Sequence, residues 1–81
     1  MLESAGILKF LKKEVAMILR LNEADVNEND SLDALGINSM AFVELLIAIE
    51  NKFGVQLIKS GITKADLGSL TTLADRIEQE L

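Results

Sequence analysis

Cysteine and histidine are both missing from this 81-residue sequence. Their absence excludes disulfides, a thiol nucleophile, the usual zinc sites and any triad that needs an imidazole base. We therefore expect a protein that is not an enzyme and holds no metal. Proline, tryptophan and tyrosine are missing as well, and the three phenylalanines are the only aromatic residues. Because hydrophobic residues still make up 49% of the chain, the core must be aliphatic, which favours helices packed through Leu, Ile and Val.

Positive charge is also scarce, since 13 acidic residues stand against 8 basic ones and the net charge is −5. This charge argues against binding to nucleic acid, where cations supply most of the affinity, and favours partners with a basic patch. Apolar runs such as residues 45–49 are far too short to cross a bilayer. Residues 1–14 lack the pattern of a secretory signal. We expect a cytoplasmic monomer that binds neither nucleic acid nor membrane.

The length allows a single domain over residues 1–81 with one core. Residues 3–21 predict an amphipathic helix, because apolar residues recur there at steps of three and four. Glu3 near its start and Arg20 in its last turn would complement the helix dipole. Residues 22–38 are rich in Asn, Asp and Glu, which favour turns, and predict a long loop. We expect this loop to be ordered, because it contains four apolar anchors: Val26, Leu32, Leu35 and Ile37.

Residues 39–53 predict a second long helix, which Asn38 or Ser39 caps and which ends before Gly54. One apolar stripe along this helix has the spacing of a core-facing side and consists of Phe42, Leu45, Leu46, Ile49 and Phe53. A second apolar strip lies beside it and consists of Met40, Val43 and Ile47. A helix that is apolar over so much of its circumference is either deeply buried or carries a binding face, and deep burial is hard to arrange in so small a domain.

Two shorter segments complete the predicted fold. Thr63 and Asp66 have the spacing of a capping box, which predicts a very short third helix. Thr71 or Thr72 is expected to cap a last helix, in which Asp75 lies early. The apolar face of that helix consists of Leu73, Ala74, Ile77 and Leu81. The sequence therefore predicts an all-α fold.

Ser39 stands where the long loop meets the start of the second helix, and Gly36 supplies backbone freedom just upstream. A helix start presents unpaired N–H groups and a partial positive charge, which stabilise a phosphate or a phosphodiester. A serine at this position also faces outward, within reach of a modifying enzyme. The simpler interpretation of Ser39, taken alone, is that it caps the helix.

The segment LDALGINSMAFVELLIAIENKFGVQL, residues 32–57, resembles the signature of acyl and peptidyl carrier proteins. The order of the predicted helices is similar to that family over essentially the whole chain. The resemblance implies a four-helix bundle of the acyl-carrier type, with a long loop between its first and second helices and a short third helix. It also implies that Ser39 carries covalent 4′-phosphopantetheine, which a separate phosphopantetheinyl transferase takes from coenzyme A with magnesium.

Two residues depart from the family's LGxDSL pattern. Asn38 replaces the Asp before the serine; it is a nearly equivalent cap but carries no charge. Its neutrality removes repulsion beside the phosphodiester and would weaken recognition by a transferase that reads the acid. Met40 replaces the usual Leu, which is a near-isosteric exchange.

The family's tripeptide occurs literally at Asp30-Ser31-Leu32. No long amphipathic helix begins at the hydroxyl of Ser31, however, so we do not interpret it as an attachment site. We interpret Asp30 and Ser31 as turn or capping residues for a short helical turn over residues 32–35.

The second helix also carries the candidate partner surface. Five of its residues match positions at which the family docks its enzymes: Met40, Val43, Glu44, Ile47 and Asn51. The alternative for Val43 or Ile47 is that either side chain packs under the long loop instead.

The resemblance implies a non-catalytic carrier that tethers acyl or aminoacyl intermediates as thioesters and delivers them to loading, condensing and tailoring enzymes. The second helix is less acidic than in typical fatty-acid carriers and has Lys52 near its end. Together with the segments LGINSM and FGVQL, this favours a polyketide or nonribosomal peptide pathway. A carrier of fatty-acid synthesis and a D-alanyl carrier are alternatives. A rival hypothesis, to which Asn38 lends weight, is an interaction module with the carrier fold but no phosphopantetheine.

Overall fold

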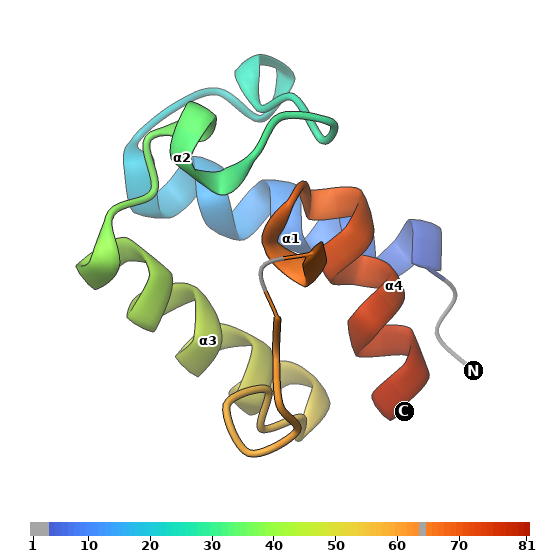
Figure 1. Ribbon diagram of the computed structural model, residues 1–81. Coiled ribbons are helices and arrows are strands. Elements are labelled where there is room, and N and C mark those ends of the chain that lie inside the picture. The colour runs from blue at the N-terminus through green and yellow to red at the C-terminus, as the bar shows by residue number, and fades with distance from the viewer. Residues whose placement is uncertain (1–3, 64) are drawn as a thin grey trace.

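The computed structural model describes residues 4–63 and 65–81 (Figure 1). Its α-helices are α1 (Ser4–Leu19), α2 (Leu32–Leu35), α3 (Ser39–Phe53) and α4 (Leu70–Glu80), and its 3₁₀ helices are η1 (Glu23–Asp25) and η2 (Ala65–Leu67). No strand occurs in these residues, and the predicted all-α fold is confirmed. The short helix predicted third is present as η2, and α2 lies within the predicted long loop.

α1 is the helix on which both α3 and α4 pack. Figure 1 shows α3 and α4 standing apart from each other, with α1 passing above α3 and behind α4 in this view. The largest fully buried side chains between these elements are all aliphatic: Ile7, Leu11, Val15, Val26, Leu45, Ile49, Leu70, Leu73 and Ile77. Since burying each such side chain contributes about 1.5–3 kcal/mol, this aliphatic core holds the helices together.

The end of α3 is fixed by a glycine and by an aromatic pair. Gly54 has a φ of 72° and donates its N–H to the carbonyl of Glu50, so it ends the helix as predicted. Phe53 meets Phe10 of α1 edge to face, with ring centroids 5.1 Å apart. The Nζ of Lys52 lies 5.9 Å from the centroid of the Phe10 ring. These contacts join the last turn of α3 to α1.

The end of α1 differs from the sequence prediction. The helix stops at Leu19, and Arg20 lies beyond it with a φ of 58°. Leu21 then donates its N–H to the carbonyl of Ala16 at 2.8 Å, a bond typical of a left-handed helix end. The prediction that Arg20 belongs to the last turn is therefore wrong, because the chain reverses at this residue. Glu3, predicted near the helix start, lies outside the described residues.

The predicted loop over residues 22–38 is ordered by its apolar residues, as expected. Val26, Leu32 and Ile37 are buried in the core, and Leu35 packs against it. From α4, the N–H and the hydroxyl of Thr71 both donate to the carbonyl of Glu28 at 3.2 Å. The loop is therefore held in place by its buried side chains and by the hydrogen bonds from Thr71 of α4.

The start of α4 corrects a second prediction. The residue that caps this helix is Ser69, whose Oγ accepts the Thr72 N–H at 3.1 Å. Thr72 in turn accepts the Ser69 N–H through its own hydroxyl, which completes a capping box. Neither Thr71 nor Thr72 is thus the N-cap residue, because the helix has already begun at the buried Leu70. In the middle of α4, Asp75 accepts the hydroxyl of Ser4 at 2.6 Å, which links α1 to α4.

η2 is held by a second reciprocal contact. Thr63 donates its N–H to Asp66 Oδ2 at 2.9 Å, and the Asp66 N–H donates to Thr63 Oγ1 at 3.4 Å. This is the capping box that the Thr63 and Asp66 spacing predicts.

Candidate functional site

Ser39 is the first residue of α3, and its neighbour Asn38 is the cap. Asn38 Oδ1 accepts the N–H of Ala41 at 2.9 Å, and the Asn38 carbonyl accepts the N–H of Phe42 at 2.9 Å. Of the two predicted caps, Asn38 is therefore the one that the helix uses. The hydroxyl of Ser39 is not needed for capping, and the residue is exposed.

The turn before Ser39 sets the direction in which the chain enters α3. Gly36 ends α2 with a φ of 93° and donates its N–H to the carbonyl of Asp33 at 3.0 Å. Ile37 donates its N–H to the carbonyl of Leu32 and buries its side chain. Because the left-handed conformation at Gly36 is strained for other residues, glycine at this position is a structural requirement.

Ser39 lies at the N-terminal end of α3, which carries the partial positive charge of the helix dipole. The N–H groups of Ser39 and Met40 precede the first hydrogen bond of the helix, and Asn38 adds no negative charge beside them. A helix start of this kind stabilises an attached phosphate.

Ser31 has the structural role predicted for it. Its Oγ accepts the N–H of Ala34 at 3.1 Å, so it caps α2, which runs for only four residues. The literal family tripeptide at Asp30-Ser31-Leu32 thus starts a single helical turn.

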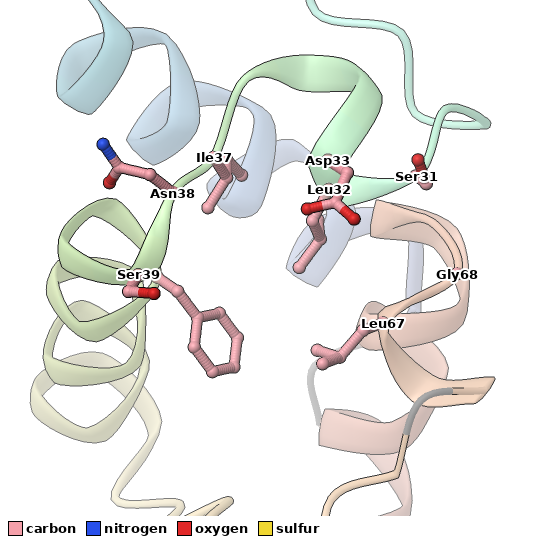
Figure 2. A pocket seen from close by; sticks show the side chains of 9 residues that line it. Ser31, Leu32, Asp33, Ile37, Asn38, Ser39, Leu67 and Gly68 are labelled. Carbon is pink, nitrogen blue, oxygen red and sulfur yellow. The ribbon is translucent and has the colours of Figure 1, made fainter.

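A groove lies beside Ser39, between α2 and the start of α3 on one side and η2 on the other (Figure 2). We call it the Ser39 groove; its volume is about 650 Å³, and it is lined by Ser31, Leu32, Asp33, Ile37, Asn38, Ser39, Phe42, Leu67 and Gly68. In Figure 2, Leu32 and Ile37 point into it from one side and Leu67 from the other, whereas Asn38 points away. Sequence reasoning missed this groove, because Leu67 and Gly68 lie far from Ser39 in the chain and carry no motif.

The predicted partner surface forms one exposed side of α3. Met40, Val43 and Ile47 are 77%, 53% and 54% exposed. The alternative that Val43 or Ile47 packs under the loop is therefore wrong, because about half of each side chain is exposed. Glu44 and Asn51 are also exposed. An additional exposed apolar residue, Ile58, lies across a cavity of about 330 Å³ that Val43 and Ile47 help to line.

The residues around Ser39 fit a covalently attached phosphopantetheine. The serine is accessible, the helix start favours a phosphodiester, and the apolar Ser39 groove lies within reach of the hydroxyl. Among the described residues, no three or more acidic side chains form a cluster suited to a metal ion. No helix in this part of the chain is both long and apolar enough to cross a bilayer.

Comparison with known families gives a match over residues 9–77, to the family described as "Phosphopantetheine attachment site". No solved structure matches the chain. Members of this family are non-catalytic carriers that hold 4′-phosphopantetheine on a serine and interact with a phosphopantetheinyl transferase and with the enzymes of a pathway. Because the match extends from the first half of α1 into α4, the chain belongs to this family of phosphopantetheine carrier proteins.

Proposed function

We propose that Ser39 is the serine that carries the phosphopantetheine. The observation behind this proposal is which serine hydroxyls take part in hydrogen bonds within the fold. Among the described residues, Ser4, Ser31, Ser60 and Ser69 each use their hydroxyl in an internal hydrogen bond, and Ser39 does not. Modification of Ser39 would therefore break no bond of the fold.

The chain's own contribution to the modified state is electrostatic. The amides at the start of α3 stabilise the negative phosphodiester, and Asn38 holds the helix in place without adding a repelling charge. When bound, the phosphopantetheine supplies a terminal thiol that holds an acyl or aminoacyl group as a thioester. Ser39 fixes one end of the group, and the exposed setting leaves the other end accessible to partner enzymes.

The partner surface is the second part of the proposal. Met40, Val43 and Ile47 give an apolar centre, and Glu44 and Asn51 give it a polar edge. This is the usual composition of a protein interface, with an apolar centre and a polar rim. We assign it to the phosphopantetheinyl transferase and to the loading, condensing and tailoring enzymes.

The favoured setting is a polyketide or nonribosomal peptide pathway in the cytoplasm, where coenzyme A supplies the group. Two features of α3 support it over fatty-acid synthesis: its only acidic residues are Glu44 and Glu50, and Lys52 follows in its last turn. Whether the cargo is acyl or aminoacyl would follow from the mass of the thioester trapped on the protein.

The test is the intact mass of the protein after incubation with coenzyme A, magnesium and a broad-specificity transferase. The mass is expected to rise by one phosphopantetheine. Ser39→Ala should abolish this rise, and Ser31→Ala is the matched control that should keep it.

Loading of the Ser39→Ala variant would overturn the assignment of Ser39. If the unmutated protein gained no mass with several transferases, the interaction module without phosphopantetheine would replace the carrier function.

A further inference from the structure

Arg76 of α4 is the residue that connects η2 to the rest of the fold. Its side chain is only 16% exposed, and all three of its guanidinium nitrogens donate hydrogen bonds. Nη1 donates to Asp66 Oδ2 at 2.9 Å, Nη2 to the carbonyl of Ser60 at 2.6 Å, and Nε to Glu80 Oε1 at 3.0 Å. One side chain therefore joins η2, the connection before it and α4.

Asp66, which Arg76 contacts, is itself part of η2. The same Oδ2 accepts the N–H and the hydroxyl of Thr63, and the Asp66 carbonyl accepts the hydroxyl of Thr72 at 3.1 Å. The next two residues, Leu67 and Gly68, line the Ser39 groove. In Figure 2 they form its wall opposite Ser39. Hydrogen bonds to α4 therefore help to fix the position of that wall.

The turn at Gly68, which ends this wall, leaves little room for a side chain. A Cβ on Gly68 would lie 3.3 Å from the carbonyl oxygen of Ala65, which is closer than side chains normally approach. The turn from η2 into α4 is therefore tight at Gly68.

We propose that Arg76 is a positioning residue that sets the width of the Ser39 groove by holding η2 on α4. The inference rests on the proposed function only in taking Ser39 as the attachment residue. Arg76 acts at a distance from Ser39, because it fixes the wall that the attached group faces. A lysine does not replace it, since a single ammonium lacks the planar fork that reaches three acceptors.

The first test uses the protein without phosphopantetheine and compares Arg76→Met and Arg76→Lys with Glu80→Gln, the matched control that removes only the negative charge paired with Arg76 within α4. The readout is hydrogen exchange, resolved by NMR, at the amides of Asp66 and Gly68, which bond to Thr63 and Ala65. Loss of bonds to a charged group should raise exchange there about tenfold or more in Arg76→Met. Arg76→Lys should lie between it and the unmutated protein, and Glu80→Gln should change little.

The second test loads Ser39 with a phosphopantetheine analogue that ends in a dansyl group. Its emission should shift to longer wavelength in Arg76→Met, because the displaced wall no longer covers the dye, and should be unchanged in Glu80→Gln. Unchanged exchange at Asp66 and Gly68 would overturn the proposal. An equal rise at Leu11 and Leu45 would overturn it as well, since Arg76 would then act on global stability alone. Failure of loading would count against Ser39 as the attachment residue and leave the exchange result intact.

Discussion

The side-chain oxygen of Asn38 accepts the backbone N–H of Ala41 at 2.9 Å. This bond separates two roles that adjoin in the sequence, since Asn38 secures the helix and Ser39 is left available for modification. A serine that also capped the helix would lose that bond on modification.

Removal of this cap should weaken the fold by a measurable amount. Asn38→Ala is expected to lower the free energy of unfolding by about 1 kcal/mol, because the Ala41 N–H loses its acceptor. Asn38→Asp keeps an acceptor, and its charge favours the helix start, so its stability should equal or exceed that of the unmutated protein. Urea denaturation followed by circular dichroism measures both. Equal loss in the two variants would show that the bond contributes nothing.

Arg20 is a site where the fold carries backbone strain. Its φ of 58° disfavours a residue with a Cβ, so Arg20→Gly should raise the free energy of unfolding by about 0.5–1 kcal/mol. Gly54→Ala is the opposite substitution at a φ of 72°, in open space, and should lower it by about 1 kcal/mol. Thermal unfolding compares the two. A less stable Arg20→Gly would mean that the arginine side chain offsets the strain.

Asp66 should make stability depend on pH in acid. The bond from the Thr63 N–H lowers the pKa of its carboxyl below the ordinary 3.8, and the Thr63 hydroxyl and Arg76 lower it further, against an opposing effect of burial. Because the folded pKa is lower than the unfolded one, the unfolded chain binds more protons in acid. The contribution is fully present above the ordinary pKa and is lost as the pH falls through the lowered one.

The measurement is the urea midpoint from about pH 6 to about pH 2 in the unmutated protein and in Asp66→Asn. The difference between them should be constant at the upper end and should narrow in acid. A difference that stays constant throughout would contradict the lowered pKa.

The apolar side of α3 should matter for partners and not for folding. Val43→Ser and Ile47→Ser are expected to change the free energy of unfolding by no more than about 0.5 kcal/mol, because both side chains are largely exposed. Each should raise the KM of the transferase for the unloaded protein. Met17→Ser, at an exposed position on α1, is the matched control and should leave that KM unchanged. A KM equally insensitive to all three substitutions would remove the transferase from this surface.

The periodicity of the apolar residues was enough to predict the long helices and the core side of α3. Periodicity succeeds here because Leu45 and Ile49 lie on the apolar side of α3, and that side is the one that packs into the core. Gly54 was predictable for a similar reason, since a left-handed residue after a helix is usually glycine.

Helix ends that depend on competition between neighbouring residues were not predictable. Ser69 and the two threonines after it all have side chains that cap helices, and the burial of Leu70 decides among them. The Ser39 groove was hidden for another reason: Leu67 is brought beside Ser39 by tertiary contacts, among them the bond between Arg76 and Asp66. No pattern along the chain predicts that Leu67 and Ser39 line the same groove.

The hydrogen bond between Ser4 and Asp75 joins residues 71 positions apart. α1 packs on both α3 and α4, and α4 is the later of the two to leave the ribosome, so the buried residues of α1 lack part of their packing until α4 has emerged. Local helices form in the growing chain, but its core closes late. Ser39 therefore reaches its folded position at the start of α3 only after α4 has been made, so a transferase that reads the folded surface acts after α4 has left the ribosome.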